Sequence, residues 1–244
     1  MPESTIALVT GGSRGIGAAI ALRLAELGSD VAITYAQSKE SADEVVNQIA
    51  AHGRRGLAIK ADSAAADEVV DAVERTAAEF GGLDILVNNA GIFPYGVIDD
   101  VPLEEVDRTL NIHVRAVYVA SQAAVRHMSE GGRIVSIGSN LAERVPHPGI
   151  ALYAMSKSAL IGFTKGLARD VGDRGITVNL VQPGSTDTDM NPGDGHTADD
   201  QRALAALGRY ADAREIANAV AFLASPEASY ITGALLTADG GTNA

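Results

Sequence analysis

A hydroxyl, a phenol and an ammonium group occur within nineteen residues near the middle of the chain, on Ser139, Tyr153 and Lys157. A free tyrosine keeps its proton up to a pKa of about 10, and a neighbouring ammonium lowers that pKa because it favours the phenolate. The phenol can then give or take a proton near neutral pH. The serine hydroxyl can hydrogen-bond a substrate oxygen whose charge changes. Together the three groups suit general acid–base chemistry.

The elements predicted around these groups would bring them together. Residues 151–170 are predicted to form a helix, because good helix formers and apolar residues recur there at steps of three and four. Tyr153 and Lys157, four residues apart, then lie on one helix face. Ser139 follows the apolar segment 133–137, a predicted buried strand. Taken alone, the tyrosine and lysine would more often be an ordinary surface pair, so the catalytic interpretation depends on the rest of the chain.

Composition restricts the classes of function. The chain has 244 residues, of which 46% are hydrophobic, and it contains no cysteine, which rules out disulfides and thiolate metal sites. A formal charge of −12 argues against nucleic acid or an anionic membrane as a partner. The five histidines show no metal-binding spacing, so no metal is expected. Neither a signal peptide nor a membrane span is apparent, and we expect a cytoplasmic protein.

Strand and helix patterns alternate along the whole chain. The expected strands are 5–9, 31–35, 57–60, 83–87, 133–137, 177–181 and 234–237, and the expected helices are 18–28, 41–51, 64–80, 103–128, 151–170 and 214–223. Such alternation with short connections predicts an α/β fold with a parallel sheet and helices on both faces. No domain boundary is apparent, because the most loop-like segment, 193–200, is too short to be a linker.

A glycine-rich turn lies between the first strand and the first helix. Gly11, Gly15 and Gly17 would allow a tight turn and a close approach of the backbone to a pyrophosphate at the helix N-terminus. The spacing is TGxxxGxG, with two more residues between the first two glycines of the motif than in the common dinucleotide fingerprint GxGxxG. Its position at the first strand–helix junction predicts a dinucleotide site.

Charge favours NADP(H) as the cofactor. An NAD site usually has an acidic residue after the second strand, but here the first acid is Glu40. Arg14 lies inside the glycine turn, and Tyr35, Gln37 and Ser38 add hydroxyl and amide donors that suit a 2′-phosphate. The alternative is that Arg14 is merely solvated and that NAD binds.

Several motifs in this order resemble the classical short-chain dehydrogenase/reductase family over essentially the whole chain, and within it the NADPH-dependent ketoreductase or 3-oxoacyl-reductase branch. The resemblance implies a single Rossmann-fold domain, residues 1–244, with a doubly wound parallel seven-stranded sheet. Its cofactor half would be about 1–130 and its catalytic half about 131–244. The motifs are Thr10–Gly17, Asn88-Asn89-Ala90-Gly91, Asn111, Ser139, Tyr153 with Lys157, and Pro183-Gly184.

The resemblance also implies roles for these residues. Tyr153 would donate the proton to the carbonyl and Ser139 would hold its oxygen. Lys157 would lower the pKa of Tyr153 and bind the nicotinamide ribose, and Asn111 would hold a water. Asp62 would contact the adenine, and Thr186 and Thr188 the carboxamide. A homotetramer, or a homodimer, is implied as well. The full set of expected cofactor contacts is Gly11, Ser13, Arg14, Gly15, Ile16, Gly17, Tyr35, Gln37, Ser38, Asp62, Asn89, Gly91, Tyr153, Lys157, Pro183, Gly184, Thr186 and Thr188.

Two features depart from the family pattern. Ser139 precedes Tyr153 by fourteen residues where thirteen is usual, and Asn140 occupies the usual position. The basic pair of members that act on acyl-carrier protein is replaced by the acidic segment 128–132, although Arg174 is kept. Because an anionic carrier would be repelled, we expect hydride transfer from NADPH to a small or medium neutral ketone. The alternatives are a 3-oxoacyl-thioester reductase, an alcohol or polyol dehydrogenase, and a non-catalytic NADP(H)-binding sensor.

Overall fold

Seven parallel strands form one sheet at the centre of the molecule. The computed structural model describes residues 4–244, and the strands follow the order β3-β2-β1-β4-β5-β6-β7 across the sheet. The chain therefore leaves β1 in one direction and returns beside it with β4, which is the doubly wound arrangement that the sequence predicts. The strands are β1 (Ile6–Val9), β2 (Asp30–Tyr35), β3 (Gly56–Lys60), β4 (Ile85–Asn88), β5 (Arg133–Ile137), β6 (Thr177–Pro183) and β7 (Leu235–Ala238).

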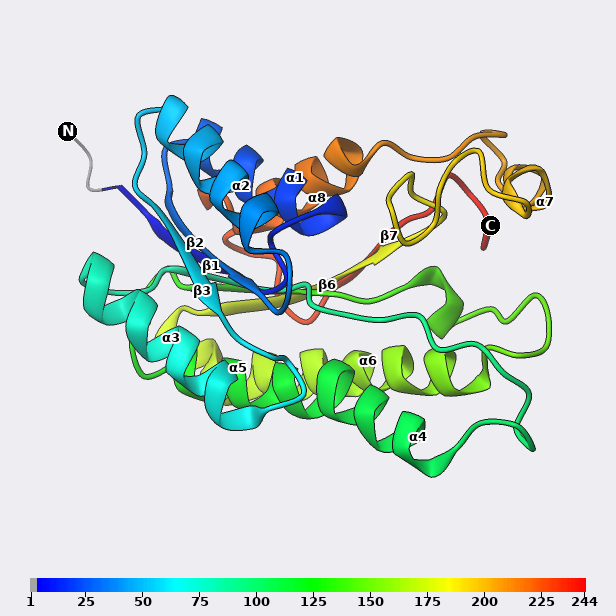
Figure 1. Ribbon diagram of the computed structural model, residues 1–244. Helices are drawn as coiled ribbons and strands as arrows, with labels where there is room; N and C mark the ends of the chain where they lie inside the picture. Colours follow the sequence, from blue (N-terminus) through cyan, green and yellow to red (C-terminus); the bar gives the residue numbers. More distant parts are fainter. Residues whose placement is uncertain (1–3) are drawn as a thin grey trace.

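Helices cover both faces of this sheet (Figure 1). On one side lie α1 (Gly15–Glu26), α2 (Lys39–Ala51) and α8 (Ala213–Ala224); on the other lie α3 (Ala66–Phe80), α4 (Leu103–Leu110), α5 (Ala116–Ala124) and α6 (Ala151–Val171). A hydrophobic core lies on each face of the sheet, and successive strand residues alternate between the two cores. Leu8 packs with Leu86 and Ile134 on one face, whereas Val9 packs with Ile33 on the other. Burial on both faces explains why the strands read as continuous apolar runs.

The single helix predicted over 103–128 is wrong, because a π-helical turn interrupts it. Asn111–Arg115 forms this turn between α4 and α5, and the Ala116 N–H donates to the carbonyl oxygen of Asn111, five residues earlier. A π turn adds one residue to a helical turn and is often found at functional sites. Such an insertion hardly changes the spacing of apolar residues, which is why the periodicity does not reveal it.

The connection between β6 and α8, residues 184–212, reaches over the carboxyl ends of the strands (Figure 1). It contains the short helix α7 (Ala198–Leu204) where the sequence indicates only a loop. Gln201 fastens the connection, since its side chain accepts a hydrogen bond from Ser185 Oγ at 2.7 Å and exchanges two with the Asn191 amide at 3.0 Å. Within residues 4–244, no helix has the length and apolar character needed to cross a membrane.

Candidate active site

The glycine turn after β1 forms a concave backbone surface, called here the cradle, at Gly11, Gly15 and Gly17. Side chains at these three positions would fill it. Gly11 has a φ of +63°, and its N–H donates to Thr34 Oγ1 at 2.9 Å. A Cβ on Gly17 would collide with the Gly11 carbonyl oxygen, and one on Gly15 would lie 3.3 Å from Thr188 Cγ2. The three glycines thus keep backbone groups accessible at the N-terminus of α1, where a pyrophosphate binds favourably.

Asn89 and Thr10 hold this cradle in shape. The Asn89 side-chain amide donates to the carbonyl oxygens of Thr10 and Gly11 at 2.9 and 3.1 Å. Thr10 Oγ1 accepts hydrogen bonds from the N–H groups of Asn89 and Ala90 at 2.9 and 3.1 Å. The amide hydrogens of Asn89 are therefore used within the protein. Sequence reasoning assigned Asn89 to the cofactor and overlooked the supporting threonines, Thr10 and Thr34.

The residues predicted to recognise a 2′-phosphate lie beside the cradle. Arg14 precedes α1, and its Nη1 lies 3.9 Å from Asp189 Oδ2 in the β6–α8 connection, with the two side chains 64% and 75% exposed. Gln37 and Ser38 are exposed directly after β2. Tyr35 differs, because it is 9% exposed and belongs to the core cluster under α1. Arg14, Gln37 and Ser38 are thus accessible to a ligand, while Tyr35 has little surface left for one.

Three further predicted contacts lie at the same edge of the sheet. Asp62 follows β3, is exposed, and accepts a hydrogen bond from the Ala64 N–H at 2.9 Å. Ser13 and Ile16 are partly exposed in the glycine turn, and Ile16 also packs against the core. The turn residues are therefore partly accessible surface and partly packed against the core.

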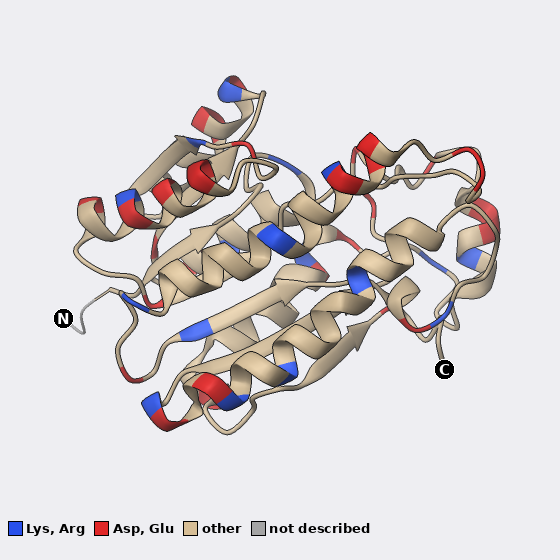
Figure 2. Cartoon of the chain, turned by 90° about the horizontal axis from the view of Figure 1, so that it is seen from below, with Lys and Arg blue, Asp and Glu red and all other residues tan. Residues whose placement is uncertain are grey.

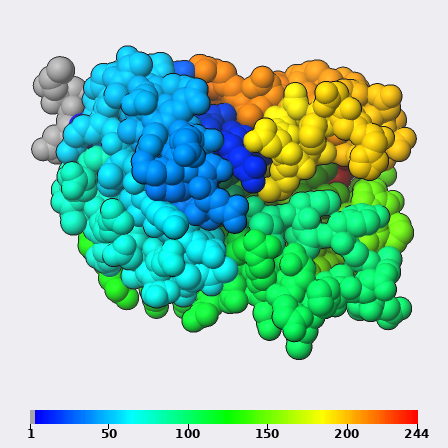
Figure 3. Space-filling view, viewed as in Figure 1, coloured from blue at the N-terminus to red at the C-terminus, as the bar shows by residue number. Residues whose placement is uncertain are grey.

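The segment after β6 closes the far side of the cradle. β6 ends at Pro183, and the Gly184 N–H donates to the Ala238 carbonyl at 3.1 Å. Thr186 is buried, and its hydroxyl donates to the Gly184 carbonyl at 3.1 Å. Thr188 is the residue that approaches Gly15. Figure 3 shows a hollow between this yellow segment and the green segment that follows β4.

Tyr153, Lys157 and Ser139 lie together where α6 begins and β5 ends. Lys157 is 5% exposed; its Nζ donates to the Ile137 carbonyl at 2.9 Å and lies 5.9 Å from the centre of the Tyr153 ring. Ser139 hydrogen-bonds Tyr153, and its Oγ also accepts from the Leu141 N–H at 3.1 Å. Ser139 therefore contacts the phenol despite the fourteen-residue spacing.

The pKa values of the site differ from the expectation for Tyr153. Burial lowers the pKa of the Lys157 ammonium to about 8. Burial also raises the pKa of Tyr153, and the hydrogen bond with Ser139 is what opposes that rise. The lowering of the Tyr153 pKa by Lys157 is thus not found, because the ammonium is directed at the Ile137 carbonyl. At neutral pH the phenol keeps its proton.

Two aromatic residues that sequence reasoning missed pack against Tyr153. The Phe93 ring meets it edge-on with centres 4.8 Å apart, and the His113 ring does so at 5.8 Å. His113 is 1% exposed and lies in the π turn that begins with the half-buried Asn111. The spacing of the histidines shows no metal-binding pattern, so the sequence does not single out His113. The sequence signal that could have identified His113 is its position two residues after Asn111.

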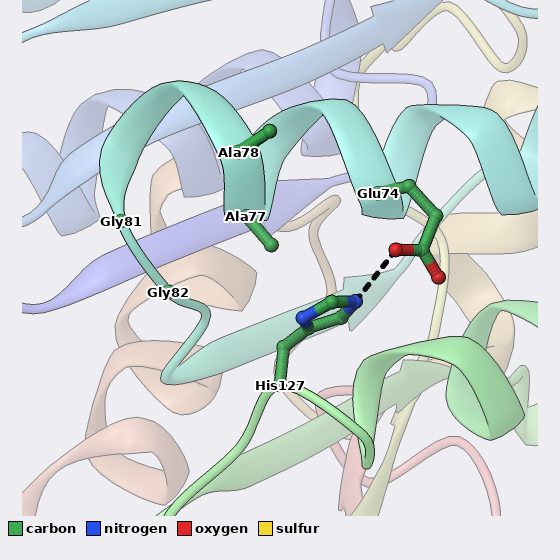
Figure 4. Close-up of a pocket in the computed structure, with 6 residues that line it drawn as sticks. All are labelled: Glu74, Ala77, Ala78, Gly81, Gly82 and His127. Carbon is green, nitrogen blue, oxygen red and sulfur yellow. Dashed lines mark hydrogen bonds and ion pairs between the residues drawn. The ribbon is translucent and has the colours of Figure 1, made fainter.

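Another hollow lies at the opposite edge of the sheet and contains none of the predicted site residues. It has a volume of about 360 Å³ and lies between the end of α3 and the segment after α5. His127 Nε2 is 2.8 Å from Glu74 Oε2 there (Figure 4). Gly82, in its wall, precedes β4, so this hollow is at the amino ends of the strands. Ligands of open α/β sheets bind at the carboxyl ends.

Comparisons with known proteins agree with the cradle geometry. The family model described as Enoyl-(Acyl carrier protein) reductase matches residues 11–243. A short chain dehydrogenase from Burkholderia cenocepacia, solved in complex with NADP, is 63% identical with a TM-score of 0.97, over 98% of both chains. A blue fluorescent protein from a metagenomic library, solved with NADPH, is 53% identical with a TM-score of 0.97 over 98% of both chains. The cyclic-di-GMP-binding biofilm dispersal mediator protein of Escherichia coli is 48% identical, over 96% of this chain and 94% of that protein.

Proposed function

Since the protein belongs to the short-chain dehydrogenase/reductase family and is an NADP(H)-dependent oxidoreductase, we propose that it reduces a small or medium-sized neutral ketone. The observation that carries this proposal is the protonated Tyr153 between Ser139 and the buried ammonium of Lys157, at the sheet edge that also bears the glycine cradle. A proton donor beside a nicotinamide site is the arrangement that carbonyl reduction needs.

The proposed chemistry joins a hydride and a proton to the carbonyl. NADPH, when bound, supplies the hydride to the carbonyl carbon. Tyr153 donates its proton to the carbonyl oxygen, and the Ser139 hydroxyl donates a hydrogen bond to that oxygen as negative charge develops on it. Lys157 holds the nicotinamide ribose beside Tyr153, and Asn111 holds a water that links Lys157 to solvent. Tyr153 keeps its proton at neutral pH and can serve as the acid in reduction, whereas alcohol or polyol oxidation would need the phenolate first.

Apolar and acidic surroundings support a neutral substrate. Phe93 and Tyr95, which follow β4, are 43% and 69% exposed, and Phe93 touches the Tyr153 ring. Figure 2 shows acidic residues at the right-hand end of the molecule, where α7 carries Asp199 and Asp200. The guanidinium of Arg174, the basic residue kept from the family pattern, is already engaged, because it donates to two backbone carbonyls at the end of α5. These features disfavour the 3-oxoacyl-carrier substrate that the family model's description would suggest.

The same proposal includes the remaining cofactor contacts, the domain organisation, the oligomeric state and the location in the cell. We place the 2′-phosphate at Arg14, Gln37 and Ser38, the adenine at Asp62, and the ribose at Gly91 with Lys157. The chain is proposed to act as one domain, residues 1–244, with a cofactor half of about 1–130 and a catalytic half of about 131–244. We further propose a homotetramer or homodimer in the cytoplasm, without nucleic acid, membrane or metal as a partner.

A non-catalytic NADP(H)-binding sensor is the second candidate. The Escherichia coli relative is named as a cyclic-di-GMP-binding mediator, with no reaction in its name, which favours this alternative. The proton donor argues against it, since a sensor has no need of Tyr153 beside Ser139 and Lys157.

Cofactor binding and turnover together decide between the candidates. NADPH and NADH are titrated by fluorescence, and NADPH oxidation is then followed with cyclic and aryl ketones, 1,2-diketones, β-keto esters and an acetoacetyl thioester. We expect NADPH to bind more tightly than NADH and a neutral ketone to be the best substrate. Turnover mainly of the thioester would contradict the argument from acidic surroundings. Cofactor binding without turnover in either direction would favour the sensor.

A further inference from the structure

His113 connects three segments of the active site through its two ring nitrogens. Nε2 accepts a hydrogen bond from the Ile92 N–H at 3.0 Å, and Nδ1 lies 2.8 Å from Ser156 Oγ. Ser156 Oγ in turn donates to the Tyr153 carbonyl at 2.7 Å. Because Nε2 is the acceptor, the proton must be on Nδ1, which donates to Ser156. One imidazole thus links the loop after β4, the π turn and the first turn of α6.

The His113 side chain that makes this link is buried and has a single protonation state. His113 is 1% exposed, Ser156 is fully buried, and burial with the nearby Lys157 ammonium lowers the pKa of His113 to about 3. The ring is therefore neutral, with one donor and one acceptor, each of them used. Neither ring nitrogen is available to ligate a metal or to exchange protons with a substrate.

The loop held by His113 also passes close to Lys157. A Cβ on Gly91 would lie 3.2 Å from His113 Nε2 and 3.6 Å from Lys157 Nζ. The histidine therefore sets how closely the Gly91–Ile92 backbone approaches the ammonium. Its ring edge also rests against Tyr153, so a shift of the imidazole would move both sides of the site.

We propose that His113 is a positioning residue that fixes the Gly91–Ile92 backbone, through Nε2, and the Tyr153 turn of α6, through Nδ1 and Ser156. The first link sets cofactor affinity and the second sets the orientation of the proton donor. The second part rests on the proposed function, because it concerns turnover. The first part concerns NADPH binding and stands without a known substrate.

Two conservative variants separate the two links. His113→Asn can keep a donor near the Nδ1 position for Ser156 but cannot reach Ile92, whereas His113→Gln can keep an acceptor near the Nε2 position but loses the donor to Ser156. We expect His113→Asn to weaken NADPH binding more than it lowers kcat, and His113→Gln to do the opposite. His113→Phe breaks both links and should lower kcat/KM by about 10- to 100-fold, since misplacement by about 1 Å can cost that much.

The measurements are the NADPH Kd by fluorescence, kcat and KM at saturating NADPH, and Tm. His127→Gln serves as the control, because His127 also has a hydrogen-bonded side chain but lies at the opposite edge of the sheet. The proposal is overturned if the three His113 variants change only Tm, or if the Asn and Gln variants lose affinity and kcat equally. If the wild-type protein reduces no ketone, the proposed function fails, while the NADPH Kd values still test the link to Ile92.

Discussion

Removal of the buried charge of Lys157 should stabilise the fold while it abolishes activity. Burial lowers the pKa of Lys157 from 10.5 to about 8, which corresponds to a cost of about 3 kcal/mol for the charged form at neutral pH. Lys157→Met removes that cost but leaves the Ile137 carbonyl without its donor, a loss of about 1 kcal/mol. The net gain of about 2 kcal/mol should raise Tm by about 4–8 °C in a chain of this size.

The gain should depend on pH in a defined direction. Below pH 8 the lysine is charged in both the folded and the unfolded state, and the wild-type protein carries the full cost. Between about pH 8 and 10.5 only the unfolded state binds the proton, so the stability of the wild-type protein rises with pH relative to Lys157→Met. Stability of this kind is commonly sacrificed at active sites.

Thermal unfolding of both proteins at pH 7 and pH 10 measures this effect. Lys165→Met is the matched control, because Lys165 is an exposed lysine on the same helix and its removal should leave Tm nearly unchanged. The reasoning would be refuted if Lys157→Met unfolds at a lower temperature than the wild-type protein at pH 7. It would also be refuted if the difference in Tm between the two proteins stays constant up to pH 10.

Two further predictions concern the cofactor and the reaction. Arg14→Ala should weaken NADPH binding by about tenfold, the value of one charge-assisted hydrogen bond of about 1.5 kcal/mol, and leave NADH within about twofold; equal losses in a fluorescence titration would exclude the phosphate contact. Ketone reduction should fall above about pH 8, because Lys157 loses its proton there and its neutral amine should hold the nicotinamide ribose less well; a pH–rate profile that stays flat to pH 10 would show that this charge is not needed.

The sheet could be predicted from the sequence because its signals are local. Apolar runs alternate with helical periods, and glycines mark the first turn, so the strands and the doubly wound arrangement follow from pattern and connection rules. The π turn at Asn111 could not be predicted in this way. One extra residue in a helical turn barely changes the period, and the hydrogen-bond partners of His113 in this turn are distant in sequence.

The grouping of Ser139, Tyr153 and Lys157 could be predicted from the sequence, but the pKa of Tyr153 could not. Tyr153 and Lys157 share a helix face as their spacing indicates, and Ser139 reaches the phenol from the end of β5. The direction of the Tyr153 pKa was wrong, because it depends on burial and on the Ile137 carbonyl that takes the ammonium. His113 was missed because its hydrogen-bond partners, Ile92 and Ser156, are 21 and 43 residues away.

Replacement of Tyr153 by phenylalanine tests the central claim most directly. Tyr153→Phe removes the hydroxyl that hydrogen-bonds Ser139 and keeps the ring that packs against Phe93 and His113. NADPH affinity and ketone reduction are measured on the same preparation. General acid catalysis contributes about 10²–10⁴-fold, so reduction should be lost by at least about 100-fold with NADPH affinity nearly unchanged. Turnover above about a tenth of the wild-type rate would contradict the role of Tyr153 as the proton donor.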